Sequence, residues 1–319
     1  MIISVVIPLF NKASTIGRCV NSVLMQTRPA DELVVVDDGS TDGSGDVLAH
    51  LPALRLRLIR QENAGVSCAR NRGIRDSSGD VIAFLDADDE WKPDFLAVIE
   101  RLSRRHPEAG AFATSYVFAR DDHQFVSAPP FSELLMREGL LTRYFDAAAG
   151  GAMPLSSSSI AVRRSTFDAV GAFQAGAVWG EDTEMWTRIY LQFPIAYSPE
   201  PLTQYHVFAP NRAGARVEPR PMMPVVRTLE QALDHGHISA EEVAGAERCI
   251  CNSIEFTVKA NIYLGYRNLA AEQLRSLLRY PCSRRAYWFF KVLTQVPYGC
   301  LRAGIRARQI ARGVSDARA

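Results

Sequence analysis

Acidic side chains follow two short apolar segments of this sequence. Asp37 and Asp38 come directly after the run 33–36, and the cluster Asp86-Ala87-Asp88-Asp89 follows the run 81–85. Such runs predict buried strands, and ligands bind beyond the carboxyl ends of parallel strands. Carboxylates gathered there repel one another unless a cation or hydrogen-bond donors join them. A divalent cation with a nucleotide diphosphate meets this need, because Mg²⁺ takes one or two protein carboxylates and completes its shell with water and phosphate oxygens.

A purely structural role is the alternative for these carboxylates, because Asp is common in turns and at helix caps. A single Asp-Asp pair would favour that interpretation. Two clusters after two apolar runs favour ligand binding instead.

Alternating strand and helix patterns in residues 1–105 must position these side chains. Repeated βα units of this length predict an α/β fold with a mainly parallel sheet and helices on both faces. The expected strands are 2–9, 33–36, 54–59 and 81–85. The expected helices are one that Ser14 caps and that reaches Leu24, followed by 66–74 and 93–105.

The rest of the chain divides into a less regular part and a helical part. Strands are expected at 111–119, 160–162 and 205–208, with a helix at 181–193; a linker rich in proline follows residue 210, and residues 226–315 show helical patterns. We therefore predict one unit over 1–215, with halves at about 1–110 and 111–215, and a helical C-terminal region over 216–319.

Composition excludes disordered, collagen-like and disulfide-scaffold proteins. Apolar residues make up 47% and charged residues 22%, which is typical of a globular chain. The net charge of +1 predicts no nucleic-acid partner, and six cysteines without metal-binding spacing are typical of reduced thiols in the cytoplasm. The start lacks a basic segment and a cleavage site, and no apolar stretch is long enough to span a membrane, so we expect neither a secretory signal nor a spanning helix.

Five segments, in a fixed order, carry a resemblance to a known family. They are Ser4-Val-Val-Ile-Pro-Leu-Phe-Asn11, Leu33-Val-Val-Val-Asp-Asp-Gly-Ser-Thr-Asp42, Asn63-Ala-Gly-Val-Ser-Cys-Ala-Arg-Asn-Arg-Gly73, Gly79-Asp-Val-Ile-Ala-Phe-Leu-Asp-Ala-Asp-Asp89 and Gly180-Glu-Asp-Thr-Glu-Met-Trp-Thr-Arg188. Together they resemble the family 2 inverting glycosyltransferases of the GT-A fold. The resemblance covers about two thirds of the chain and fades after residue 215.

The resemblance implies a donor site for a nucleotide-diphospho-sugar, most simply a UDP-sugar. Asp38 would accept a hydrogen bond from the base, Arg70 would contact the nucleotide or its diphosphate, and Asp86 would lie near the ribose. Asn63 would contact the ligand or hold a loop turn. The full set implied for the donor is Pro8, Phe10, Asn11, Asp38, Asn63, Arg70, Asp86 and Ala87.

The same resemblance implies a metal ligand and a general base. Asp88 would hold Mg²⁺ or Mn²⁺, which stabilises the departing diphosphate as a Lewis acid. Asp182 would take the proton of the acceptor hydroxyl, a contribution of roughly 10²–10⁴-fold to the rate. The alternative for Asp182 is a helix-dipole role, because a helix is expected to begin there.

Two tryptophans and one histidine near the predicted base each have a packing role and a ligand role as alternatives. Trp186 is expected to pack in the interior, and Trp179 would form a sugar platform or pack. Many family members carry a Tyr-Arg-x-His pattern, where this chain has Tyr205-His206-Val207-Phe208. This departure favours a structural role for His206 over a ligand role.

A basic and aromatic segment lies near the C-terminus. Residues 273–315 hold nine basic residues and no acidic ones, with aromatic residues interleaved. Basic charge with interfacial aromatic residues is typical of a membrane-surface segment, so we expect residues 280–312 to contact a membrane. The alternatives are packing on the first unit and a solvated tail.

These observations predict a metal-assisted, inverting glycosyltransferase of the hexosyltransferase type. Its acceptor would be a glycan or a lipid-linked sugar of the cell envelope or an exopolysaccharide, on the inner face of a bacterial plasma membrane. One alternative is a non-catalytic scaffold of the same fold, which the intact Asp86, Asp88 and Asp182 argue against. Another is a dinucleotide-dependent oxidoreductase, but Gly43-Ser-Gly45 lacks the third glycine of that motif and follows the second strand instead of the first.

Overall fold

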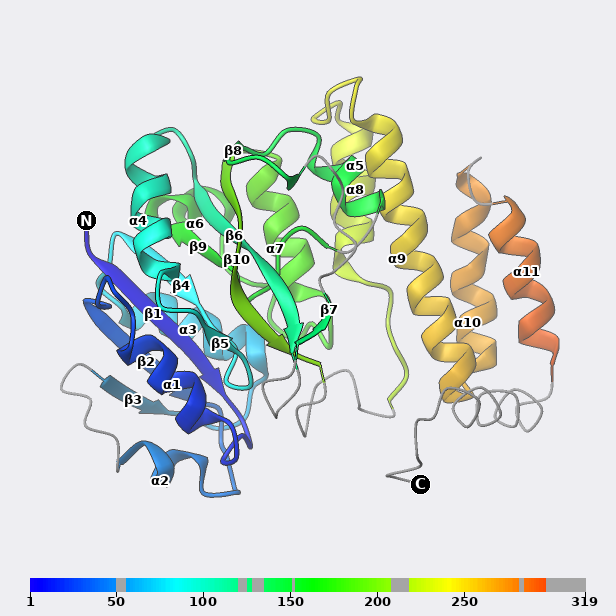
Figure 1. Ribbon diagram of the computed structural model, residues 1–319. Helices are drawn as coiled ribbons and strands as arrows, with labels where there is room; N and C mark the ends of the chain where they lie inside the picture. The colour runs from blue at the N-terminus through cyan, green and yellow to red at the C-terminus, as the bar shows by residue number, and fades with distance from the viewer. Residues whose placement is uncertain are drawn as a thin grey trace.

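The computed structural model describes residues 1–49, 56–119, 125–127, 135–150, 153–207, 218–280 and 284–296. A mixed sheet crosses the N-terminal part of the molecule, and helices cover it (Figure 1). Its strands are β1 (Ile3–Leu9), β2 (Glu32–Asp37), β3 (Leu56–Arg60), β4 (Val81–Phe84), β5 (Glu90–Trp91), β6 (Ala111–Ala119), β7 (Phe125–Ser127), β8 (Gly139–Leu140), β9 (Ile160–Arg163) and β10 (Ile195–His206).

The sheet has a parallel half and a mixed half. The strand order is β3-β2-β1-β4-β9-β6-β10-β5, with β7 beside β6 and β8 beside β10. Strands β3, β2, β1 and β4 are mutually parallel, whereas β9 is antiparallel to both of its neighbours. Every residue of β1 and β4 is buried, because helices cover both faces of the sheet. The predicted α/β class with a mainly parallel mixed sheet is confirmed.

Helices follow most strands of the parallel half and continue beyond the sheet. They are α1 (Ile16–Leu24), α2 (Ser44–Ala49), α3 (Val66–Asp76), α4 (Phe95–Arg105), α5 (Tyr144–Gly150), α6 (Arg164–Val170), α7 (Glu181–Tyr190), α8 (Pro224–Asp234), α9 (Val243–Leu264), α10 (Arg267–Leu274) and α11 (Arg284–Gln295), with a 3₁₀ turn at Arg275–Arg279. Helix α3 lies close against β1, and a side-chain carbon at Gly73 would overlap Val6.

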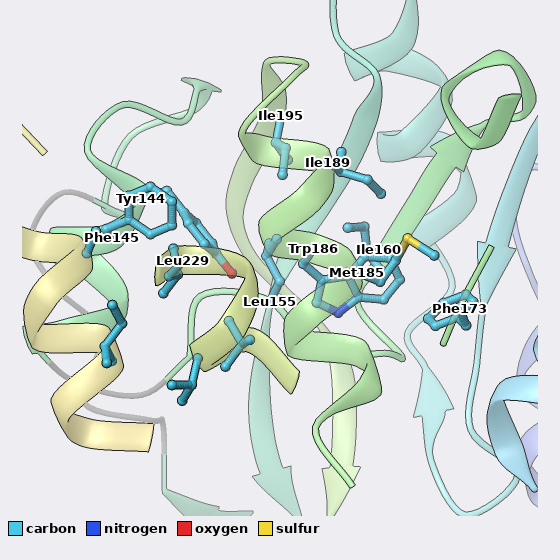
Figure 2. Close-up of a cluster of buried hydrophobic side chains, with 14 of the residues drawn as sticks. Tyr144, Phe145, Leu155, Ile160, Phe173, Met185, Trp186, Ile189, Ile195 and Leu229 are labelled. Carbon is cyan, nitrogen blue, oxygen red and sulfur yellow. The ribbon is translucent and has the colours of Figure 1, made fainter. Parts of the chain in front are cut away.

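Helix α7 is anchored by the core that lies between the sheet and the C-terminal helices. Met185, Trp186 and Ile189 on this helix are fully buried, and they pack among residues from β9, β10 and α8 (Figure 2). The Trp186 ring lies 5.6 Å from the ring of Phe173, measured between centroids. This burial fixes the first turn of α7, which carries Asp182, beside the sheet.

The C-terminal helices pack on the same core. Helix α8 contacts α7, and α9 contacts α5, while α10 and α11 extend the layer away from the sheet (Figure 1). The predicted helical C-terminal region is therefore confirmed over its described part. The expected unit boundary near 215 and residues 297–312 of the basic segment lie outside the described residues, so the division into units stays a prediction. Among the described residues, no helix combines the length and apolarity that a membrane crossing requires.

Several elements differ from the expectation. Strand β10 begins ten residues before the expected 205, because Pro199 and Pro201 near its middle break the regular alternation that would have indicated its first part. A register shift falls at these prolines, between β10 and β6. The short elements α2, α5, α6, β5 and β8 have no sequence pattern strong enough to predict them.

Candidate functional site

A pocket of about 550 Å³ opens at the carboxyl ends of β1, β2 and β4. This is the edge at which parallel strands present ligand sites. Its wall is formed by Pro8, Leu9, Phe10, Lys12, Asp38, residues 63–67, Ala69, Arg70, residues 86–89, residues 176–178, Glu181, Tyr205, His206 and Glu218.

Most of the residues predicted for the donor and the metal meet in this wall. They are Pro8, Phe10, Asp38, Asn63, Arg70, Asp86, Ala87 and Asp88. Asn11 and Asp182 are not part of the wall, although Asp182 adjoins Glu181, which is. The left-handed Asn11 (φ 52°) accepts a hydrogen bond from the Thr41 backbone at 2.8 Å, so that it ties the loop after β1 to the loop after β2.

Asp38 organises the loop that precedes α3. Its Oδ1 accepts hydrogen bonds from the Gln61 side chain at 2.7 Å and the Ala64 amide at 2.9 Å, and its Oδ2 accepts one from the Gly65 amide at 2.8 Å. The Asn63 side chain donates to the Asp38 carbonyl at 2.9 Å. Asn63 therefore holds the loop turn, which is one of the two roles predicted for it. An ionised carboxylate offers about four acceptor positions, so Asp38 retains capacity for a ligand donor.

The loop of residues 86–89 is held by α1 and by its own turn. The Thr15 hydroxyl donates to the Ala87 carbonyl at 2.9 Å, and the Arg18 guanidinium donates to the Asp88 carbonyl at 2.9 Å. The Asp89 amide donates to the Asp86 carbonyl at 2.9 Å. Burial, with the neighbouring carboxylates of Asp88 and Asp86, raises the pKa of Asp89 well above its ordinary value.

Asp88 carries a cation contact. The Lys12 ammonium lies 2.6 Å from Asp88 Oδ2, and both side chains are mostly buried. No set of three or more His, Cys, Asp or Glu side chains with metal-binding geometry occurs in the described part of the chain. Mg²⁺ needs only one or two protein carboxylates, so the pocket-lining Asp88, which already attracts a cation, fits a metal shared with a diphosphate. The sequence reasoning missed Lys12, which directly follows the first motif.

Arg70 joins the two acidic regions of the site. Its guanidinium donates to Asp86 Oδ1 at 2.7 Å and to Glu181 Oε1 at 2.8 Å, and the side chain is only 2% exposed. Its Cζ also lies 5.4 Å from the centroid of the Phe173 ring. Burial lowers the pKa of Arg70, but the Asp86 and Glu181 carboxylates raise it by more than burial lowers it. The net effect is a raised pKa, so Arg70 stays charged. Arg70 thus lines the pocket and also bridges two elements, a role that the sequence did not indicate.

Asp182 lies in the first turn of α7, where two other residues hold it. Its Oδ1 accepts a hydrogen bond from the Thr183 amide at 2.7 Å, and its Oδ2 accepts one from the Ser157 hydroxyl at 3.1 Å. The neighbouring Glu181 is buried, and this burial, with the nearby charge of Asp182, raises the pKa of Glu181 against the opposing effect of Arg70. The arrangement keeps an acidic pair beside the pocket.

Trp186, Trp179 and His206 have identifiable surroundings. Trp186 is fully buried, which confirms its packing role. Trp179 stacks on Phe256 of α9 with centroids 5.2 Å apart. The buried His206 places Nε2 2.8 Å from Glu90 Oε1 and donates its backbone amide to Asp89 at 2.9 Å. These bonds agree with a structural histidine, although His206 also lines the pocket.

Comparisons with known proteins agree with this geometry. The sequence profile of the family described as Glycosyl transferase family 2 matches residues 4–171. Glycosyltransferase GlyA of Streptococcus pneumoniae serotype 4 is 34% identical over 125 residues, which are 39% of this chain and 18% of GlyA. TuaG of Bacillus subtilis, a glycosyltransferase assigned provisionally by its name to teichuronic acid biosynthesis, is 34% identical over 134 residues, or 40% of this chain and 53% of TuaG. The chain therefore spans less than two thirds of either relative.

A solved structure shares the fold over almost the whole chain. TarS 1–349 of S. aureus, in complex with UDP-GlcNAc, aligns with a TM-score of 0.64 and 18% identity, and the alignment covers 95% of this chain and 92% of that one. This similarity confirms the expected GT-A fold, including the helices after the sheet.

Proposed function

Because this chain belongs to glycosyl transferase family 2, we propose that it is an inverting glycosyltransferase that takes its sugar from a UDP-sugar. One observation carries the proposal: Asp38, Asp86 and Asp88 line a single pocket, and Asp182 lies at its border beside Glu181. Carboxylates separated by up to 144 positions in the sequence thus converge where parallel strands end.

The donor proposal rests on the chemistry of the pocket. Asp38 keeps acceptor capacity for the imide N–H of a uracil base, and Pro8 and Phe10 offer apolar surface beside it. TarS, which shares the fold, has been solved with UDP-GlcNAc and with UDP, and this supports a uridine nucleotide here.

The proposed reaction is a single displacement at the anomeric carbon. The acceptor oxygen forms a bond to this carbon while the bond from the carbon to the diphosphate oxygen breaks. Asp182 takes the proton of the acceptor hydroxyl, and UDP leaves with the electron pair. Asp88 would hold Mg²⁺ or Mn²⁺, which when bound neutralises charge on the departing diphosphate.

Paired substitutions test these roles. Asp182→Asn should abolish transfer while leaving UDP affinity within about twofold, because the change removes the base but keeps the shape of the side chain. Asp168→Asn, on the exposed face of α6, is the matched control and should transfer normally. Asp88→Ala should abolish the Mn²⁺-dependent part of UDP binding in calorimetry. Normal turnover by Asp182→Asn would overturn the assignment, and hydrolysis of the donor by the unmodified protein separates an enzyme from a non-catalytic scaffold.

The proposed acceptor is a glycan or lipid-linked sugar of the cell envelope or an exopolysaccharide, met at the inner face of the plasma membrane. TuaG, named for teichuronic acid biosynthesis, supports an envelope acceptor. Helix α11 supports contact with the membrane, because Trp288, Phe289 and Val292 on it are 61–63% exposed. Exposed basic side chains flank them, and Lys291 Nζ lies 5.0 Å from the centroid of the Trp288 ring. Aromatic and basic residues on one helix face suit an anionic lipid surface.

Vesicle sedimentation tests this contact. The protein should bind vesicles that contain anionic lipid, and binding should weaken with salt because each Arg or Lys near the surface contributes about 1 kcal/mol. Trp288→Ser should release it. Phe256→Ser, which removes an exposed aromatic side chain from α9, is the control and should bind as before. Equal binding by Trp288→Ser and the unmodified protein would refute the assignment of α11.

A further inference from the structure

Two adjacent serines before β9 reach two different acidic parts of the site. Ser157 and Ser158 are 4% and 0% exposed. Ser157 donates its hydroxyl hydrogen bond to Asp182 Oδ2 at 3.1 Å. Ser158 donates to Asp89 Oδ2 at 2.6 Å, and its hydroxyl oxygen accepts a hydrogen bond from the Asp86 amide at 3.1 Å. Two neighbouring side chains therefore contact both the general base and the loop of residues 86–89.

The backbone of this serine pair is itself held from several sides. The Ser158 carbonyl accepts hydrogen bonds from the Trp91 indole at 2.6 Å and from the Thr203 hydroxyl at 3.0 Å. The Ser159 carbonyl accepts one from the Thr114 amide at 3.0 Å. These partners come from β5, β10 and β6, so the pair is anchored to the rigid sheet and not to a surface loop.

The two oxygens of Asp182 are held from different elements. Oδ1 is bonded by Thr183 of its own helix, whereas Oδ2 is bonded by Ser157, which the sheet holds. Thr183 belongs to the same helix as Asp182, so its hydrogen bond cannot fix the position of the carboxylate relative to the donor pocket. The bond from Ser157 can, because the neighbouring Ser158 holds the loop that lines that pocket.

We propose that Ser157 is the positioning residue for Asp182, and that the pair Ser157–Ser158 sets the place of the base relative to the donor pocket. This inference rests on the proposed function, in which Asp182 accepts the proton of the acceptor. The hydroxyl of Ser157 donates to the ionised carboxylate and so stabilises the form that acts as a base. Proton transfer requires the base within hydrogen-bond reach of the acceptor hydroxyl, so an unheld carboxylate slows the chemical step without changing donor affinity.

The inference predicts a specific kinetic pattern for Ser157→Ala. The kcat should fall about tenfold, near the lower end of what one hydrogen bond to a charged group contributes, while the KM for the donor and the Kd for UDP stay within about twofold. Ser157→Thr, which keeps the hydroxyl, should restore most of the rate. Ser156→Ala removes a buried hydroxyl with no hydrogen-bond partner in the described part of the chain, and this matched control should keep the wild-type kcat.

The outcomes separate this inference from the proposed function. If the unmodified protein neither transfers nor hydrolyses a UDP-sugar, the proposed function fails. If it is active and Ser157→Ala keeps the wild-type kcat, the inference alone is overturned. A tenfold loss shared by Ser156→Ala would also overturn it, because the loss would then report general damage to the segment. If Ser157→Ala melts well below the unmodified protein, Ser157→Cys replaces it, and this weaker donor should give an intermediate kcat.

Discussion

Replacing Arg70 with Met should destabilise the folded protein strongly. The substitution keeps most of the side-chain volume and removes the cation that bridges Asp86 and Glu181 at 2.7 and 2.8 Å. Both carboxylates then lose their partner in a place where Arg70 itself is only 2% exposed. Breaking a buried ion pair by removing one partner costs about 3–5 kcal/mol. Because the Asp86 side chain is 27% exposed and can be rehydrated, we expect the lower end, about 3 kcal/mol.

Urea unfolding at pH 7 measures this loss, and a neighbouring ion pair provides the control. Arg72, on the same helix, pairs with Asp76, and both side chains are about a third exposed. Arg72→Met should therefore cost less than about 1 kcal/mol. The double variant Arg70→Met/Glu181→Gln should recover about 1–2 kcal/mol of the loss, because the uncompensated charge on Glu181 has been removed.

The dependence on pH has a definite sign. Burial already raises the pKa of Glu181 in the folded state, and removing the Arg70 cation raises it further. A raised pKa means that folding favours the protonated carboxyl, so stability is retained below the unfolded pKa of about 4.3 and lost as pH rises. The deficit of Arg70→Met should therefore shrink as pH falls from 7 toward 4.5. A loss no larger than that of Arg72→Met, or one that does not change with pH, would refute the reasoning.

Three further changes test the fold and the donor pocket. Hydrogen bonds from two serines lower the pKa of the partly buried Glu32 against the effect of burial, so its stabilising effect is present above about pH 4.3 and lost as pH falls. Glu32→Gln should lower the free energy of unfolding by about 1 kcal/mol at pH 7 and should leave it unchanged near pH 3; a constant difference would contradict this. Gly73→Ala should lower the free energy of unfolding by about 1–2 kcal/mol, because overlap with Val6 outweighs the helix preference of Ala. Its control, Gly150→Ala, meets open space and should leave stability unchanged. Asp38→Asn should weaken UDP binding at least about tenfold in calorimetry, because the NH₂ group of the new Asn would face backbone N–H donors whose hydrogen bonds the carboxylate accepts. Unchanged affinity would exclude Asp38 from the site that binds the uracil ring.

The sequence alone determined the elements that end at the pocket. The apolar runs before Asp38 and Asp86 predict buried strands because an uninterrupted run of this length can be satisfied only by burial on both faces. Parallel strands of one sheet bring their carboxyl ends to the same edge, so the convergence of these two carboxylates follows from the pattern. Structure confirms both strands, with β1 between β2 and β4.

Only the tertiary structure decided how the acidic groups are paired and held. Arg70 meets Glu181 across 111 positions of sequence, and Ser157 meets Asp182 across 25. Such contacts depend on the strand order, in which β9 is inserted antiparallel between β4 and β6, and on the burial of α7 against the sheet. Local periodicity indicates which face of a helix or strand is buried, but it does not indicate which distant side chain packs against that face. The strands could therefore be predicted from the residues, whereas the bridge of Arg70 and the serine pair could be seen only in the folded molecule.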